Sequence, residues 1–494
     1  MTTFLIGLVI LFLGGALYGK FCEKTFGPDD RKTPAYEKED GVDFVPMQGW
    51  KNGLINLLNI AGTGPILGPI QGILFGPIAF LLIPIGCVMG GAMHDYMSGM
   101  LSIRSGGAQM PELVRKYTGK TVYNIYNVFV CVLMFLVGAV FIYTPGDIAA
   151  TQLFGRSGSA SDVWTWVIYG VIFLYYLAAT VFPIDKVIGR IYPVFGAILL
   201  FSAVGVFGGL FLKGYPLTEL SLANWKGIYP VSGTNLIPVF FITVACGIVS
   251  GFHSTQTSII SRTMTTEREG RMTFYNMMIL EGFIAMIWAA AAMGVFALGL
   301  ADPLKTGATS VVGIVARHML GPVGGFIAIV GVIVLPITSG DTALRGLRLM
   351  LADHLHLDQT SQGKRVGLSA VIFAVVAVIL VFAKISPSGF TILWRYFSWS
   401  NQTIALFAFA IIAIYLIEQK GKSSLAFLMP LLPGIFYAFV TFSYICNASI
   451  GFHLPMNIAY VLATIFSVGY AVIVVRAGRA RYDSKAQKKS TRVG

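Results

Sequence analysis

Two apolar stretches of this sequence hold groups that could bind a ligand or a proton. In the stretch at 235–258, hydroxyl, imidazole and amide side chains interrupt the run VFFITVACGIVSGFHSTQTS. Such groups could hold a carboxylate or a peptide, and an imidazole titrates near neutral pH, which suits proton coupling. The alternative for the histidine is a structural role, bonded to backbone. We predict a non-helical break over Ser250–His253 and substrate contacts from Ser250, His253, Ser254 and Gln256.

The stretch at 54–74 is rich in glycine and proline. Gly62, Gly64, Pro65, Gly68 and Pro69 lie close together, and prolines in a continuous helix would remove hydrogen bonds and clash with the preceding turn. Unwound backbone near Gly62–Pro65 would free amides for an anion and carbonyls for a cation. The alternative is a kink at which small residues let helices approach. The candidate substrate contacts are Asn59, Gly62, Thr63 and Gly64, and the candidate ion contact is Ala61.

Three ionisable side chains lie inside other apolar stretches, where a charge is costly unless it is paired or hydrated. His94 and Asp95, near the end of the stretch at 76–102, form either a gate or proton relay, or an interfacial cap of a helix end. Glu281, within NMMILEGFIAMIW, must pair or stay protonated, which makes it a candidate coupling carboxyl.

A last polar group opens the stretch at 400–417. Asn401 and Gln402 follow Trp399 at the expected membrane edge. They either contact substrate or belong to an interfacial belt, in which aromatic residues are common.

The elements that carry these residues are predicted to be membrane-spanning helices. The 494 residues are 56% hydrophobic and only 12% charged, whereas soluble domains carry about 25% charged residues. A bilayer core needs about 20 apolar residues per helix, and about thirteen suitable stretches are present. Their limits are 4–19, 54–74, 76–102, 122–143, 163–183, 190–212, 235–258, 274–299, 311–340, 366–383, 400–417, 425–446 and 457–475.

The positions of the basic residues predict how these helices are oriented. If the chain starts outside and ends inside, the cytoplasmic segments hold 28 Lys and Arg and the outer segments hold 7. Cytoplasmic loops carry such an excess of positive charge. We therefore expect a multi-pass protein of the inner (plasma) membrane whose basic tail faces anionic lipid, with no nucleic-acid partner.

The spacing of the stretches predicts an internal duplication. Stretches two to six and seven to eleven start at similar intervals, and five helices separate the copies, so the copies are inverted. Each copy opens with a broken helix, as in secondary transporters with a midplane site. The predicted parts are an extra N-terminal helix (1–20), a cytoplasmic loop (21–52), the two five-helix repeats (53–213 and 234–418), two C-terminal helices (424–476) and a basic tail (477–494).

Four motifs resemble the carbon starvation protein A family, whose members include proteins described as peptide or pyruvate importers. They are NIAGTGPILGP (59–69), ITVACGIVSGFHS (242–254), GDTALRGLRLMLAD (340–353) and LWRYFSWSNQTIA (393–405). The family is similar to the amino acid–polyamine–cation superfamily. The resemblance thus implies an all-α, leucine-transporter-like 5+5 inverted repeat.

The same resemblance implies a sodium site, because sodium-coupled relatives of this fold place two hydroxyls opposite the first break. Thr338 and Ser339 would supply them here, next to Asp341. A salt bridge between Asp341 and Arg345 could replace the cation, so coupling to protons and coupling to sodium both remain open.

The predicted function is secondary active import of a short peptide or a pyruvate-like carboxylate, driven by a proton or sodium gradient. No cofactor and no enzymatic activity are expected, since neither an HExxH helix nor a GxxxxGK[ST] run is present. A passive channel and an intramembrane enzyme are the alternatives. The sequence does not predict the oligomeric state.

Overall fold

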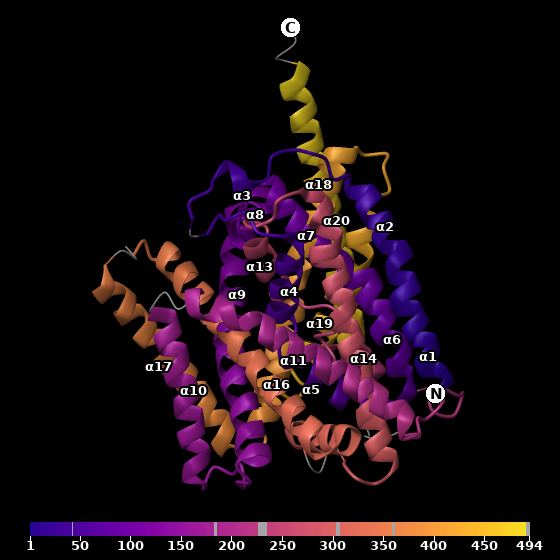
Figure 1. Cartoon of the computed structure of the whole chain (residues 1–494). Coiled ribbons are helices and arrows are strands. Elements are labelled where there is room, and N and C mark those ends of the chain that lie inside the picture. Colours follow the sequence, from indigo (N-terminus) through magenta and orange to yellow (C-terminus); the bar gives the residue numbers. More distant parts are fainter. Residues whose placement is uncertain (42, 182–184, 226–234, 303–306, 358–360, 491–494) are drawn as a thin grey trace.

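The computed structural model describes residues 1–41, 43–181, 185–225, 235–302, 307–357 and 361–490, and the chain folds as packed helices (Figure 1). Within these ranges there is no strand, only an isolated bridge between Met47 and Met264. In the described residues, ten helices are long and apolar enough to cross a membrane, and the segment Val163–Ala179 is apolar but shorter. The ten match ten of the thirteen predicted stretches. The other three are this shorter helix and the two broken stretches.

The first predicted repeat starts with a broken helix. A surface helix, α8 (Met110–Thr118), lies between α7 and α9. The members of the repeat are α4 (Gly49–Ile60), α5 (Gly64–Gly72), α6 (Ala79–Gly86), α7 (Met93–Arg104), α9 (Lys120–Ile148), α10 (Val163–Val181) and α11 (Asp185–Leu212).

The second repeat has the same order. Its fourth element is a long helix that is kinked at Gly321, where the backbone is left-handed (φ 74°). The members are α12 (Phe241–Thr243), α13 (Gly251–Ile260), α14 (Met277–Ala297), α16 (Ala308–His354), α17 (Gln362–Ile385) and α18 (Gly389–Lys420).

Helices at both ends of the chain flank the two repeats. α1 (Thr2–Val9) and α2 (Gly15–Phe26) form one rod, joined by a π-helical turn, that packs against α6, α7 and α14. α19 (Leu428–Asn447) and α20 (Met456–Ser490) pack against α18. The helix α20 continues far into the segment predicted as a basic tail.

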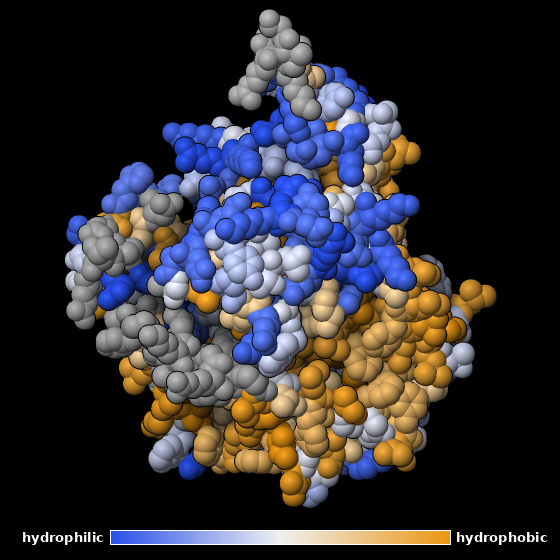
Figure 2. Space-filling view, turned by 45° about the horizontal axis from the view of Figure 1, so that its top comes forward, coloured by the Kyte–Doolittle hydropathy of each residue, from blue (hydrophilic) through white to orange (hydrophobic). Residues whose placement is uncertain are grey.

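The surface matches a protein that is embedded in lipid. Figure 2 shows hydrophilic side chains over one end of the molecule and hydrophobic side chains over the flank below it. Large apolar residues such as Val171, Val378 and Ile465 are exposed on the outer faces of α10, α17 and α20. The most buried of the candidate spans are those containing α14 and α18. A lipid-facing shell thus surrounds an inner pair of helices.

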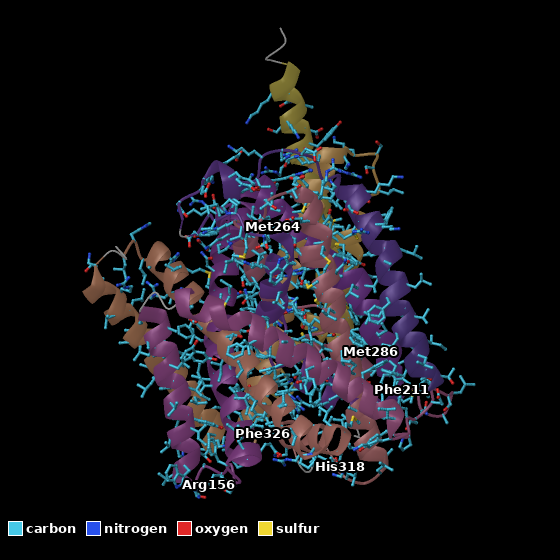
Figure 3. All side chains as sticks on the ribbon, viewed as in Figure 1. Arg156, Phe211, Met264, Met286, His318 and Phe326 are labelled. Atoms are coloured by element: carbon cyan, nitrogen blue, oxygen red, sulfur yellow. The ribbon has the colours of Figure 1, made fainter. Side chains whose placement is uncertain are left out.

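The arrangement of the loops agrees with the charge pattern. Met264 lies toward the end of the molecule that holds the C-terminus, and Arg156 and His318 lie at the opposite end (Figure 3). The two basic loops 104–120 and 262–271 touch, since Arg262 Nε donates to the carbonyl oxygen of Gly107 at 3.0 Å. They are therefore on one side, as predicted. That this side is cytoplasmic stays a prediction.

Candidate functional site

The first break separates α4 from α5. α4 ends at Ile60, Ala61 and Gly62 leave the helix, and Thr63 caps the start of α5 at Gly64. This confirms a break in the predicted place, although Gly64 and Pro65 already belong to the next helix. Asn59 and Thr63 are buried here, and their side-chain oxygens Oδ1 and Oγ1 have no hydrogen-bond partner among the described residues. Polar atoms of this kind are free to meet a ligand.

The second break lies earlier in the chain than predicted. Non-helical backbone runs from Val244 to Ser250, and it includes Gly247 in the left-handed region (φ 88°). The prediction of unwound backbone over Ser250–His253 was wrong, because α13 starts at Gly251. His253 therefore lies in the first turn of a helix, which fixes the direction of its ring.

The two breaks face each other. A Cβ atom added to Gly64 would lie 2.2 Å from the Cβ of Cys246, closer than real side chains approach. Only glycine allows this contact between the start of α5 and the second break. The sequence predicted that the two breaks meet, and the structure confirms it.

Residues of α18 hold the second break in place. Asn401 Oδ1 accepts a hydrogen bond from the backbone amide of Phe252 (2.8 Å), and its Nδ2 donates to Ser250 Oγ (3.0 Å). Gln402 Nε2 donates to the carbonyl oxygen of Phe241 in α12. Asn401 and Gln402 lie in the buried middle of α18 rather than at a membrane edge, so the interfacial alternative was wrong. Both amides position the break.

Four predicted ionisable residues come together beside the second break. Asp95 Oδ1 lies 2.8 Å from Nδ1 of His94, and Asp95 Oδ2 lies 2.9 Å from Nδ1 of His253. On its other side, His253 Nε2 lies 3.4 Å from Glu281 Oε2. The residues come from α7, α13 and α14, and all four are almost completely buried. We call this set, His94, Asp95, His253 and Glu281, the acid–histidine cluster.

The hydrogen bonds of the cluster leave room for additional protons. A carboxylate only accepts, so both imidazoles donate Nδ1–H to Asp95. Among the residues that the structure describes, Nε2 of His94 and both carboxylate oxygens of Glu281 have no hydrogen-bond partner. Buried carboxylates need compensating charge, which a proton on His253 or on Glu281 supplies. The interfacial alternative for His94 and Asp95 is excluded by their complete burial.

The hydroxyl pair on α16 lies against the first break, as the resemblance implied. Ser339 Oγ donates to the carbonyl oxygen of Leu58 (3.1 Å), while Thr338 Oγ1 donates to Leu335 in its own helix (2.8 Å). Asp341 forms an ion pair with Arg345 at 3.4 Å. The two hydroxyls and the carboxylate therefore already have protein partners.

The other predicted contacts on α13 differ in their partners. Ser254 Oγ donates to the carbonyl oxygen of Gly251 in its own helix (2.6 Å). Gln256 is 2% exposed, and its Nε2 reaches Thr255 Oγ1 (3.2 Å) while its Oε1 has no partner. Of Ser254 and Gln256, Gln256 is therefore the residue whose side chain has a polar atom without a hydrogen bond in the described part of the chain.

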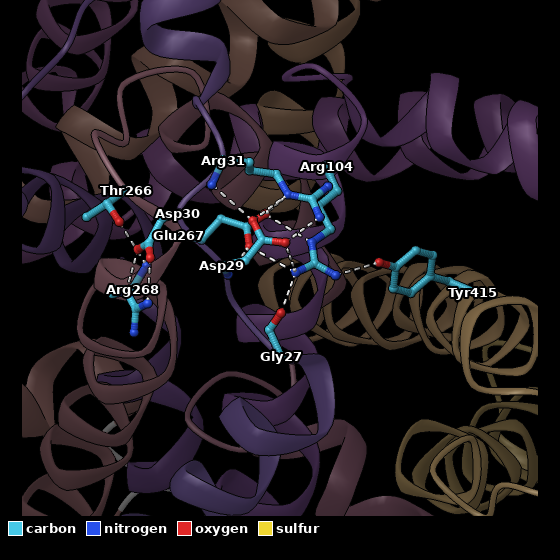
Figure 4. A network of polar contacts seen from close by, with 9 residues as sticks. All are labelled: Gly27, Asp29, Asp30, Arg31, Arg104, Thr266, Glu267, Arg268 and Tyr415. Atoms are coloured by element: carbon cyan, nitrogen blue, oxygen red, sulfur yellow. Dashed lines mark hydrogen bonds and ion pairs between the residues drawn. The ribbon is translucent and has the colours of Figure 1, made fainter.

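Sequence reasoning missed two further networks. At the end of α9, Lys384 Nζ lies 2.6 Å from Asp147 Oδ1, and Thr309 Oγ1 donates to Asp147 Oδ2 (3.0 Å). At the end of α7, Arg104 donates two hydrogen bonds, of 3.0 and 2.9 Å, to the buried carboxylate of Glu267 (Figure 4). These partners are 162 to 237 residues apart in the sequence, so no local pattern indicates them.

The network in Figure 4 also includes carboxylates outside the membrane spans. Asp29 accepts from Arg31 Nη2 at 2.6 Å, and Asp30 pairs with Arg268 Nε at 2.7 Å. The hydrogen bond from Arg31 holds the pKa of Asp29 well below its usual range. Arg268 lowers the pKa of Asp30 in the same way. The loop after α2 is thereby tied to the loop before α14.

Comparison with known families decides the membership. The profile of "Carbon starvation protein CstA" matches residues 1–181, 146–301 and 288–444. The chain belongs to this family. An uncharacterized membrane protein of Haemophilus influenzae is 41% identical over 60% of this chain and 91% of its own length.

Two relatives of this CstA family chain carry functional names. The peptide transporter CstA of Escherichia coli is 27% identical over 57% of this chain, and the pyruvate/proton symporter BtsT of the same organism is 25% identical over 53%. The matches cover 48% and 44% of those proteins, so the chain spans about half the length of these relatives.

Solved structures confirm the predicted fold. MhsT in complex with L-phenylalanine superposes with a TM-score of 0.59 over 86% of this chain and 98% of its own, at 12% identity. A mutant manganese transporter of Eremococcus coleocola superposes with a TM-score of 0.56 over 87% of this chain and 94% of its own, also at 12% identity. The protein therefore has the leucine-transporter-like 5+5 inverted repeat. At this identity the likeness concerns the fold alone.

Proposed function

We propose that this protein is a secondary active transporter of the plasma membrane that imports a short peptide or a small carboxylate together with protons. The observation that carries the proposal is the acid–histidine cluster beside the second break. The names of the relatives support transport of such cargo, and the fold is one that other transporters use. A buried group of two carboxylates and two imidazoles is the part of the molecule best suited to take up and release a proton.

The position of the cluster supports coupling to cargo. It links α13, which starts at the second break, to α7 and α14, and the second break contacts the first through Gly64 and Cys246. α5 and α13 both begin at a break, and helix N-termini favour anionic groups. A proton taken up by Glu281 or His253 makes the region more positive, which stabilises a bound carboxylate. By linkage, the carboxylate raises the proton affinity equally.

The test is uptake into proteoliposomes that contain the purified protein. Dialanine and pyruvate serve as probes, with a proton gradient imposed in sodium-free buffer. We expect saturable accumulation that a protonophore abolishes. Equilibration without accumulation would identify a passive channel. Accumulation that follows a sodium gradient and ignores the proton gradient would favour the hydroxyl pair of α16 as the coupling site.

A further inference from the structure

A cavity opens on the predicted cytoplasmic side, away from the breaks. It has a volume of about 480 Å³ and lies between α8, the start of α9, the loop after α13 and the end of α16. Ligand pockets commonly have volumes of about 300–1,000 Å³, so a small peptide fits. We call this cavity the vestibule. The polar residues of its wall are Gln109, Glu112, Arg115, Tyr123, Asn127 and Arg262.

The vestibule leads toward α13. A second cavity of about 30 Å³ shares Gln109, Pro111 and Met350 with it and reaches Gln256 and Thr342. That volume holds about one water molecule, so the passage is closed to cargo at this point. Gln256 is buried, and its Oε1 lacks a partner. An unpartnered amide oxygen at a narrow passage is placed to meet a passing polar ligand.

The charges around the vestibule are of both signs. Arg262 is anchored by the Gly107 carbonyl oxygen and by Asp43 at 3.5 Å, with its guanidinium over the Phe44 ring. Arg115 lies over the Tyr123 ring, 5.8 Å from its centroid. Glu112 is one helical turn before Arg115, and in the described part of the chain neither forms an ion pair within 4.0 Å.

We propose that the vestibule binds the cargo as it leaves the transporter toward the cytoplasm, and that it selects a zwitterion. The carboxylate of an amino acid or short peptide would lie between Arg115 and Arg262, and its ammonium group would lie toward Glu112. Arginine recognises carboxylates through charge-assisted hydrogen bonds. A keto acid such as pyruvate would use the arginines but leave Glu112 without a partner. The proposal rests on the proposed function for the identity of the cargo as a transported molecule.

The experiment measures occupancy of the vestibule without any gradient. The full-length variant Asn127→Cys is labelled with a thiol reagent in open membranes, and dialanine is added as protectant. We expect saturable protection by dialanine and weaker protection by pyruvate. Arg115→Gln or Glu112→Gln should raise the half-protecting dialanine concentration by about tenfold, as expected for loss of a charged hydrogen-bond partner. Only Arg115→Gln should weaken protection by pyruvate.

Lys116→Gln provides the matched control, because Lys116 is adjacent on α8 and bonds Ser105 outside the vestibule. If the control weakens protection as much as Arg115→Gln, or if dialanine gives no protection, the proposal is overturned. Met350→Cys, on the opposite wall, replaces the reporter if Asn127→Cys does not fold. Protection without proton-driven uptake would refute the proposed function alone. Proton-driven uptake without protection would refute the vestibule site alone.

Discussion

Two buried groups of charges in this protein are built in opposite ways. In the Asp147–Lys384 pair, Asp147 receives hydrogen bonds from Lys384 and Thr309 on separate oxygens, and the ammonium group also lies over the rings of Tyr143 and Tyr169. In the acid–histidine cluster, Glu281 Oε2 lies 3.4 Å from His253 Nε2, but within the described part of the chain neither Glu281 oxygen forms a hydrogen bond.

From this difference we expect the acid–histidine cluster, rather than the Asp147–Lys384 pair, to change its charge. A pair with complete hydrogen bonding has one stable protonation state, and it ties α9 to α16 and α17. The cluster has titratable groups on both sides of His253 and unused acceptors, so several protonation states differ little in bonding. We therefore expect the fully hydrogen-bonded pair to act as a structural tie and the incompletely hydrogen-bonded cluster to act in coupling. The variants below test this distinction.

Removal of titration from the cluster should give the largest effect. His253→Gln keeps hydrogen bonding but cannot carry a proton at neutral pH, and Asp95→Asn removes the shared acceptor charge. We expect proton-driven uptake to fall by about a hundredfold, as for loss of a positioned proton-transfer group. Uptake in proteoliposomes checks this result. Any residual transport should have lost its pH dependence.

A matched control is His318→Gln, the same exchange at an exposed histidine at the end of the molecule opposite the C-terminus. It should transport like the wild type. If His253→Gln also transports normally with an unchanged pH profile, His253 is structural and the comparison between the two charge groups fails.

The Asp147–Lys384 pair should affect stability rather than coupling. Lys384→Met leaves Asp147 buried with a charge that Thr309 alone cannot balance, which costs about 3–5 kcal/mol. The variant should unfold at lower temperature in detergent, while the protein that remains folded keeps its pH profile. Adding Asp147→Asn should recover most of the lost stability. A change in pH profile without loss of stability would reverse the roles of the two groups.

Much of the fold followed from the sequence because its signals are local. Apolar length predicts a span, and Gly and Pro at membrane depth predict a break, so Gly62 lies where the first break was expected. The second break, which includes Gly247, lies a few residues before the predicted segment. The start of α13 was misplaced because it depends on Asn401, which accepts a hydrogen bond from Phe252 across more than a hundred residues of chain. No local propensity encodes that cap.

The site was only partly predictable for the same reason. Each residue of the acid–histidine cluster is a candidate from the sequence because a polar group is costly at membrane depth. The contacts among the four residues depend on how α7, α13 and α14 pack. The sequence pattern assigns Lys384 to a loop because it directly follows the predicted apolar stretch 366–383. Only its approach to Asp147, 237 residues earlier, shows that it is buried.

Ser339→Ala tests whether the hydroxyl pair on α16, rather than the acid–histidine cluster, couples transport to an ion. The hydroxyl donates to the Leu58 carbonyl oxygen beside the first break, and loss of such a bond costs about 1 kcal/mol. If protons drive transport, uptake should change by no more than about tenfold and should be the same in sodium and choline buffers. Loss of a sodium-stimulated component in this variant, measured by uptake in the two buffers, would assign the coupling ion to α16 instead.

The smallest effect is expected for an exposed carboxylate, which extends the comparison beyond the membrane. Asp29 is 48% exposed in its side chain and pairs with Arg31, and exposed pairs contribute about 0–1 kcal/mol. Because Arg31 lowers the pKa of Asp29 in the folded state, the stabilisation is complete above the unfolded pKa of about 3.9 and is lost as the pH falls through the folded pKa. Asp29→Asn should therefore lower the unfolding temperature slightly at pH 7, and the difference from wild type should shrink below about pH 4. Thermal unfolding in detergent across this range checks the sign. A difference that grows toward acid would mean that Asp29 binds a proton more tightly when folded, contrary to its contacts with Arg31 and Arg104.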